Sequence, residues 1–348
     1  MKNELNEKLV IALGKYYPKT KDLAHFLMDV LDLSRESVYR RLRSEVSFSF
    51  DEICKIACLM EISIDRLVGL GKTDKAFFDQ RVSKSSDPTE IFREIMSTNT
   101  DMLNHINKTG QDARAIFVLN RIPLSFILAY PGLTKFFYYK WTYHVHKGEM
   151  NAGFDEFVIP EEIQVICRRY KDECEWLTGD MTMIIDEKIF LYTIREINYF
   201  YKRRLLDRDH IVQMQEELQT LADNFEMLAR RGVNNYGAKV LIYLSEVDIE
   251  PNHSYIEYDG VVSVHYWTPS AELLTSYNAE LCKRQLEWIE SLKRYTILIT
   301  QCNELQQIAF FNAQKEYLKE MVDNTAEHHM LDTVKNSADL KGEIGKWC

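Results

Sequence analysis

Residues 20–71 form a series of short amphipathic segments separated by brief turns, and this series limits the possible folds more than any other part of the chain. Between Leu23 and Leu31, apolar side chains recur at the three- and four-residue spacing of a helix, and Asp32 to Ser34 then interrupt the pattern. A helix this short is stable in water only when its apolar face packs against neighbouring helices. The series therefore predicts a compact helical domain.

Small polar residues stand where these helices should begin. Thr20, Ser34 and Ser49 each precede an amphipathic segment, and such side chains cap a helix by accepting a hydrogen bond from a free backbone amide. A first helix over residues 3–17 and a short fifth helix after Ser63 complete the pattern. We therefore expect an N-terminal domain of five helices.

The helix expected over residues 35–43 carries its basic residues away from its buried face. Val38 and Leu42 are four residues apart and share the face that packs on the domain. The planar guanidinium of arginine binds a guanine edge or a phosphate, and hydroxyls near a helix N-terminus bind phosphate. A solvated basic face on an ordinary surface helix is the alternative. The residues predicted to contact DNA are Thr20, Ser34, Arg35, Glu36, Ser37, Tyr39, Arg40, Arg41 and Arg43.

Residues 49–67 resemble, without a gap, the end of the Cro/C1-type (XRE) helix-turn-helix domain. The shared features are a small polar cap, an Ile-Ala pair, a hydrophobic residue before serine and an Asp-x-Leu close; here they are Ser49, Ile56-Ala57, Ile62-Ser63 and Asp65-Arg66-Leu67. The stretch LSRESVYRRLRSE, which begins at Leu33, resembles the recognition helix of TetR-type regulators. These resemblances imply a DNA-binding domain in which the helix over residues 35–43 enters the major groove.

One spacing departs from the Cro/C1 pattern. Ala24 and Val38 are fourteen residues apart, and the turn between the two helices has no glycine. The spacing exceeds that of Cro/C1 domains by about one helical turn. We therefore expect a second helix that is longer by one turn, with the same face buried.

The net charge of −10 argues against a nucleic-acid partner when it is taken for the whole chain. Residues 1–71 hold equal numbers of acidic and basic residues, so the excess of acid lies in the rest of the chain. Four arginines fall within residues 35–43, where Glu36 is the single acid. Local charge governs a phosphate contact because the Debye length is about 8 Å. We expect specific binding by two copies rather than strong non-specific binding.

Residues 72–87 become polar toward their end and lack periodicity, which is typical of a linker. The helix-turn-helix domain would then cover residues 1–71, and a second region would cover residues 88–323. Residues 324–348 carry no core-forming pattern, and we expect a loosely ordered tail.

The second region is expected to be helical over most of its length. Residues 181–204 fit either strands or a buried helix. Residues 239–249 and 254–267 alternate like strands, and Asp259-Gly260 is a strong hairpin signal. We therefore predict a mainly α fold: a five-helix N-terminal helix-turn-helix domain and a larger helical region with a small α+β end that contains the hairpin.

Residues 209–231 carry a heptad pattern. Their apolar residues advance in steps of three and four, as the a and d positions of a coiled coil do: Ile211, Met214, Leu218, Leu221, Phe225 and Leu228. Helix-turn-helix proteins usually read two half-sites one helical turn apart. The segment is therefore a candidate homodimerisation helix, and a helix packed inside its own domain is the alternative.

Motifs for catalysis, nucleotide binding and metal binding do not occur in the sequence, which has no G-x-G-x-x-G, Walker A, H-E-x-x-H, C-x-x-C or G-x-S-x-G pattern. His144 and His146 have no carboxylate or cysteine nearby in the sequence to complete a metal site. We therefore predict no enzyme activity, no metal and no cofactor. The aromatic residues of 136–143 favour a packed core over a pocket for a small-molecule effector, whose existence stays open.

The N-terminal sequence MKNELNEKL lacks the apolar segment of a secretory signal, and no apolar run approaches the roughly 18 residues of a membrane span. Seven scattered cysteines form no disulfide framework and fit a reducing compartment. We expect a cytoplasmic protein without a membrane contact.

These observations favour a dimeric transcriptional regulator that binds double-stranded DNA. The second hypothesis is a protein-interaction module whose N-terminal helices dock a protein partner. The third hypothesis, a ligand-processing enzyme with a DNA-binding arm, requires a pocket with converging polar groups.

Overall fold

The computed structural model describes residues 4–17, 19–60, 64, 76–80, 82–109, 113–146, 153–175, 179–268 and 272–323. The chain divides into two compact units: unit 1 consists of residues 1–78 with 278–280, and unit 2 of residues 79–277 with 281–348. No helix in the described ranges is long and apolar enough to cross a membrane.

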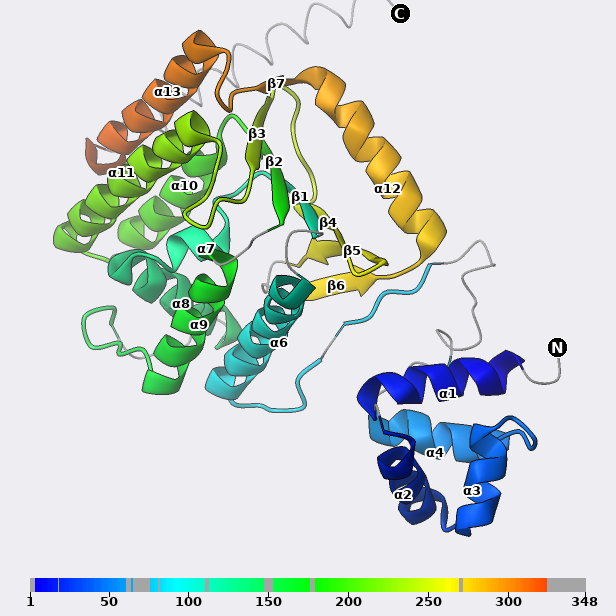
Figure 1. The fold of residues 1–348 in the computed structure, drawn as a ribbon. Helices are drawn as coiled ribbons and strands as arrows, with labels where there is room; N and C mark the ends of the chain where they lie inside the picture. The colour runs from blue at the N-terminus through cyan, green and yellow to red at the C-terminus, as the bar shows by residue number, and fades with distance from the viewer. Residues whose placement is uncertain are drawn as a thin grey trace, which may run out of the picture. The chain divides into compact units, whose positions relative to one another are not determined.

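Unit 1 is a cluster of short helices around one small core (Figure 1). Its described helices are α1 (Glu4–Tyr16), α2 (Thr20–Leu31), α3 (Arg35–Leu42) and α4 (Phe50–Met60). Each helix contributes fully buried apolar side chains at helical spacing, among them Leu13, Leu27, Val38 and Ile56. The predicted fifth helix after Ser63 lies outside the described residues apart from one position.

The turn between α2 and α3 is short. Asp32 ends α2 in the left-handed conformation, with φ at 52°, and its amide donates to the Met28 carbonyl. Ser34 then caps α3, because its side chain accepts a hydrogen bond from the Ser37 amide. The predicted Ser34 cap is thus confirmed. The long spacing from Ala24 is accommodated within α2, which continues unbroken to its end at this turn.

Unit 2 is built on a seven-stranded mixed sheet with the strand order β6-β5-β4-β1-β2-β3-β7. Its strands are β1 (Arg114–Leu119), β2 (Asp180–Asp186), β3 (Val240–Ser245), β4 (His253–Tyr258), β5 (Val261–Trp267), β6 (Leu273–Ser276) and β7 (Thr296–Leu298). β1, β2 and β3 are parallel, and the remaining neighbours pair antiparallel.

This sheet shows that the predicted mainly α fold with a small hairpin-containing end is wrong. The central strands β1 and β2 have the sequences RAIFVL and DMTMIID. Parallel strands are covered on both faces, so their sequences are nearly continuous apolar runs instead of alternating ones. Such a run has no period that separates it from a buried helix. Residues 181–204, which fit either strands or a buried helix, form both: most of β2 and then the helix Ile189–Lys202.

The hairpin prediction is confirmed. β4 and β5 pair in register from His253 opposite Tyr266 to Tyr258 opposite Val261. Asp259 and Gly260 form the turn with φ at 47° and 68°. A two-residue turn with both φ angles positive matches the right-handed twist of the strands, and the Asp-Gly pair favours it.

The helices of unit 2 are α6 (Pro88–Thr109), α7 (Leu124–Ile127), α8 (Pro131–Val145), α9 (Glu161–Glu175), α10 (Ile189–Lys202), α11 (Arg208–Arg231), α12 (Ala279–Leu292), the 3-10 helix η3 (Lys293–Tyr295) and α13 (Glu304–Asp323). In Figure 1, α10, α11 and α13 lie side by side, and α12 lies on the opposite side of the sheet. Met183 and Ile242 point from the sheet into the core beneath α8, α10, α11 and α13. On the other face, Ile289 of α12 packs with Ile116 and Ile184.

The heptad side chains of α11 pack inside unit 2. Five of them are at most 3% exposed and belong to the core shared with α8, α10 and α13: Ile211, Met214, Leu218, Leu221 and Phe225. Leu228 packs against the same core and is half-buried. The interpretation of this stripe as a dimerisation surface is therefore corrected, because the stripe is already covered by the chain's own helices.

A carboxylate on α11 caps a neighbouring helix. Glu217 Oε1 accepts a hydrogen bond from the Gly132 amide at 2.9 Å, and Oε2 accepts one from the Leu133 amide at 2.8 Å. A Cβ atom at Gly132 would lie 2.8 Å from Gln213 Nε2 and 2.9 Å from this carboxylate, so both side-chain ends would have to shift. The negative charge also favours the positive end of the α8 dipole.

Replacing Glu217 by alanine is expected to lower the free energy of unfolding of unit 2 by about 1–2 kcal/mol, because two helix amides lose their acceptor. Glu217→Gln keeps one acceptor oxygen and should cost less. Urea unfolding followed by tryptophan fluorescence measures the loss in unit 2, since all five tryptophans lie outside residues 1–78. An alanine variant as stable as the wild type would contradict the capping role.

Candidate nucleic-acid interface

The solvent face of α3 carries most of the residues predicted to contact DNA. Val38 is fully buried and fixes which face of the helix is turned inward. Ser37, Tyr39 and Arg41 are half-buried. The exposed members of the predicted set are Thr20, Ser34, Arg35, Glu36, Arg40 and Arg43.

Thr20 stands apart from the α3 residues in the sequence and in its role. α2 begins at Thr20, and Lys19 occupies the capping position without a side-chain hydrogen bond. Thr20 is thus the first residue of the helix, one position later than expected. Its hydroxyl is exposed beside the first free amides of α2, where a phosphate would be favoured.

Arg41 differs from the other arginines because it holds α3 to α4. Its Nε and Nη2 donate to the two carboxylate oxygens of Glu52, at 3.1 and 2.9 Å, and Nη1 donates to the Ser37 carbonyl. Both charged side chains are only 16% exposed. The guanidinium fork of Arg41 is therefore occupied inside the unit, although the sequence pattern groups this residue with the arginines predicted to contact DNA.

Glu52 also closes the N-terminus of α4. Its Oε2 accepts from the Ser49 amide at 2.8 Å, and the Glu52 amide donates to Ser49 Oγ at 3.2 Å, which is a reciprocal capping box. Burial alone would raise the pKa of the Glu52 carboxyl, but the hydrogen bonds from Arg41 and Ser49 outweigh it and the pKa is lowered. The carboxylate thus joins α3 to the N-terminus of α4.

Asn6 of α1 fastens the turn that follows α3. Its Nδ2 donates to the Arg41 carbonyl at 3.0 Å and to Ser44 Oγ at 2.9 Å, and its Oδ1 accepts from the Phe48 amide at 3.0 Å. The side chain is 4% exposed. Three contacts from one buried amide therefore fix where α3 ends.

The three remaining arginines lie along the exposed face. Arg35 stacks over the Tyr39 ring, with its guanidinium carbon 5.6 Å from the ring centroid. Arg40 and Arg43 are about half exposed and share the carboxylate of Glu45, which the sequence pattern does not single out. This face presents three guanidinium groups, the Ser34 and Ser37 hydroxyls, the Tyr39 phenol and the Glu36 carboxylate.

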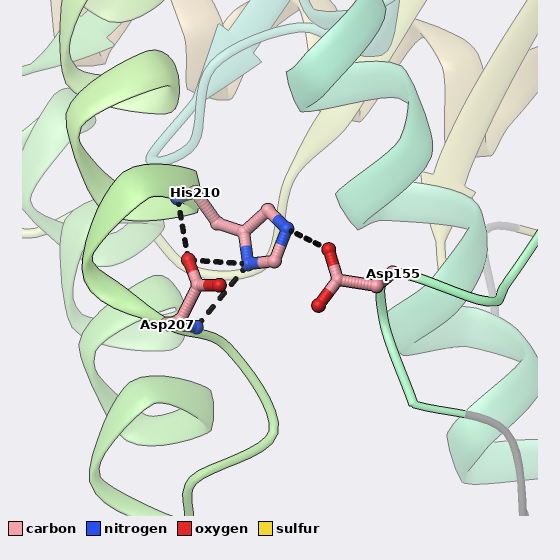
Figure 2. A group of neighbouring side chains, drawn as sticks. All are labelled: Asp155, Asp207 and His210. Carbon is pink, nitrogen blue, oxygen red and sulfur yellow. Dashed lines mark hydrogen bonds and ion pairs between the residues drawn. The ribbon is translucent and has the colours of Figure 1, made fainter.

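Among the described residues of unit 2, one cluster has the residue types of a metal site, namely Asp155, Asp207 and His210 (Figure 2). His210 Nδ1 accepts a hydrogen bond from the Asp207 amide at 3.2 Å, and Nε2 lies 2.8 Å from Asp155 Oδ1. The two carboxylates therefore approach opposite edges of the imidazole ring. Asp207 Oδ1 lies 2.8 Å from Nδ1, and one donor atom from each of the three residues lies within 4.8 Å of the others. Asp207 and His210 form the capping box of α11, and Asp155 contacts the other ring nitrogen of His210.

A buried serine–histidine pair lies in the sheet. His265 Nε2 is 2.9 Å from Ser263 Oγ, and Nδ1 is 2.9 Å from Thr275 Oγ1. The pair has the residue types of a nucleophile and its base. However, Ser263 and His265 are 1% and 2% exposed, and burial lowers the pKa of His265 to about 4. The neutral imidazole therefore links β5 to β6.

The carboxyl ends of parallel strands are the usual ligand-binding place in open α/β sheets. Here the β3–β4 connection, residues 246–252, occupies that place. Asn120, after β1, donates its Nδ2 to the Ile249 carbonyl at 2.9 Å, and Ser245, at the end of β3, bonds to Val247. Ile249 is itself buried against the sheet. Polar residues at these strand ends hold the chain's own loop.

Two shallow cavities of the described structure lie along α12. Their volumes are about 210 and 490 Å³, and both are lined by Trp288 and Ser291. Val247, Leu292 and Tyr295 add apolar walls to the smaller one. Neither has the convergent, buried polar groups that a small-molecule enzyme site needs.

No family model, curated protein or solved structure matches this chain. The residues of unit 1 that the sequence analysis did not single out are Asn6, Glu45 and Glu52. Asn6 stands in an amphipathic helix among charged residues and carries no local signal of burial. Glu45 lies only two residues after Arg43, and that nearness in sequence is a signal for the ion pair.

Proposed function

We propose that this protein is a sequence-specific DNA-binding transcriptional regulator that acts as a homodimer. The observation that carries the proposal is the exposed face of α3, where Arg35, Arg40 and Arg43 project from a helix fastened on both sides. Asn6 holds the end of α3, and the ion pair between Arg41 and its partner on α4 holds its flank. Recognition of a DNA groove requires a basic helix that is held rigidly in this way.

The proposed contact places α3 in the major groove, which admits one α-helix. An arginine fork binds the O6 and N7 atoms of guanine with two hydrogen bonds, or one phosphate. Ser34 and Ser37, at the N-terminus of α3, are suited to phosphate because the helix dipole favours negative charge there. Arg41 is assigned to holding α3 in place.

A dimer is proposed because one eight-residue helix reads only one half-site. Unit 1 carries no net positive charge in residues 1–71, so a second copy supplies the additional phosphate contacts. Unit 2 would join the copies and take any small-molecule effector rather than perform catalysis. Its contact would use a surface other than the heptad stripe of α11.

We further propose that the protein works in the cytoplasm, together with its DNA. The six described cysteines are all free thiols. A reducing compartment keeps thiols in this state.

Salt dependence separates this proposal from a protein-interaction module. Binding of the full chain to a labelled DNA duplex is measured by anisotropy at increasing salt. Phosphate contacts release condensed ions, so the logarithm of the binding constant should fall linearly and steeply with the logarithm of the salt concentration. Absence of DNA binding at low salt, or a binding constant that does not change with salt concentration, would contradict the proposal.

A further inference from the structure

Glu45 lies two residues after Arg43, the last arginine of the exposed face. The backbone sets its position. Ser44 adopts the left-handed conformation, with φ at 57°, and reverses the chain after α3. The Glu45 amide then donates to the Arg40 carbonyl at 2.9 Å. This turn directs Glu45 back over the last turn of α3.

The Glu45 carboxylate contacts two of the three exposed arginines. Its Oε1 accepts from Arg43 Nε at 2.7 Å, and Oε2 accepts from Arg43 Nη2 at 3.3 Å. The same Oε2 lies 3.8 Å from Arg40 Nε. The Nε and Nη2 edge of Arg43 is one of the donor pairs with which a guanidinium binds phosphate or guanine. A protein carboxylate therefore occupies donors that DNA would use.

The contrast with the Arg41–Glu52 pair indicates what Glu45 does. The Arg41–Glu52 side chains are 16% exposed and join two helices, whereas Glu45, Arg40 and Arg43 are about half exposed. An exposed ion pair contributes little to stability because water and salt screen it. The backbone hydrogen bonds already hold the turn. The carboxylate is therefore dispensable for the fold.

We propose that Glu45 is a built-in competitor of DNA that limits the affinity of the α3 face. This inference rests on the proposed function and describes how the affinity of the same α3 face is regulated. A phosphate must displace the carboxylate from Arg43, and the displaced carboxylate then stays within a Debye length of the DNA backbone. Both effects lower affinity for any duplex, so tight binding needs the added contacts of a specific, two-copy site.

The test compares the full-length wild type with Glu45→Gln on a short labelled duplex of random sequence. Glutamine keeps the size and one acceptor and removes the charge. The variant is expected to bind about 10-fold more tightly at low salt, with a log–log salt slope steeper by about one. Glu287→Gln is the matched control, because it removes a carboxylate from another exposed ion pair, with Lys283, in unit 2. It should bind as the wild type does.

A second comparison shows whether Glu45 acts through its arginine partner. In an Arg43→Ala background, Glu45→Gln should give a clearly smaller gain, because the donor pair that it would release is gone. Wild-type affinity for Glu45→Gln, or an equal gain in both backgrounds, would overturn the inference and leave the proposed function standing. No duplex binding by either protein at low salt would overturn both.

Discussion

Simultaneous replacement of Arg35, Arg40 and Arg43 by alanine is expected to weaken binding of a selected DNA duplex by about 100- to 1,000-fold. Each arginine is assigned one base or phosphate contact, and the loss sums to roughly 3–4 kcal/mol. The salt slope should also fall by as much as about three if all three meet phosphate, because fewer counterions are released. Anisotropy titration across a salt series measures both effects. The fold should survive, since all three side chains are exposed.

The matched control is a triple variant in which three exposed arginines of unit 2 are replaced by alanine: Arg168, Arg284 and Arg294. It changes the net charge by the same amount without touching α3. The control is expected to bind within a few-fold of the wild type. If the two triple variants lose equal affinity, the effect comes from total charge and the α3 interface is wrong.

Replacing Asn6 by alanine is expected to lower the free energy of unfolding of unit 1 by about 2–4 kcal/mol. The change removes three hydrogen bonds and leaves the buried Phe48 amide without its partner, while the Arg41 carbonyl keeps the hydrogen bond from the Ser44 amide. A buried backbone group that loses its partner costs about 1–3 kcal/mol. A small helical unit has little stability to spare.

The distribution of tryptophan makes this loss measurable in the full chain. All five tryptophans lie outside residues 1–78, so their fluorescence follows unit 2, while circular dichroism follows the helices of both units. In Asn6→Ala, part of the dichroism should be lost at lower urea with the fluorescence transition unchanged. Glu7→Ala, an exposed neighbour on α1, should stay within about 0.5 kcal/mol of the wild type. Equal behaviour of the two variants would contradict the role of Asn6 in fastening the end of α3.

The helices of unit 1 were predictable because each has its own local signal. Ser34 and Ser49 mark two helix starts, and the buried positions repeat at helical spacing. The hairpin at Asp259-Gly260 was predictable for the same reason, since the turn type selects these residues. The parallel strands gave no comparable signal, because their burial on both faces depends on helices far away in the sequence.

The sequence identifies the segment that forms the candidate interface, but it does not show which side chains of that segment are free to contact a partner. The pattern of α3 carries four arginines, but it does not distinguish Arg41, whose partner Glu52 lies on another helix. The heptad pattern of α11 has the same limit. Steps of three and four predict an apolar stripe along the helix, but they do not show which element packs on that stripe. Here α8, α10 and α13 cover it. Competition between partners is decided by tertiary packing, which a local pattern does not contain.

Selection of bound sequences from random duplex DNA by the intact protein tests the central claim most directly. Binding by two copies of α3 predicts enrichment of an inverted repeat whose half-sites are about one helical turn apart. Guanines are expected within each half-site, where arginine forks reach the major groove. Recovery of no enriched sequence, with the Arg35/Arg40/Arg43→Ala protein retaining as much DNA as the wild type, would contradict the account.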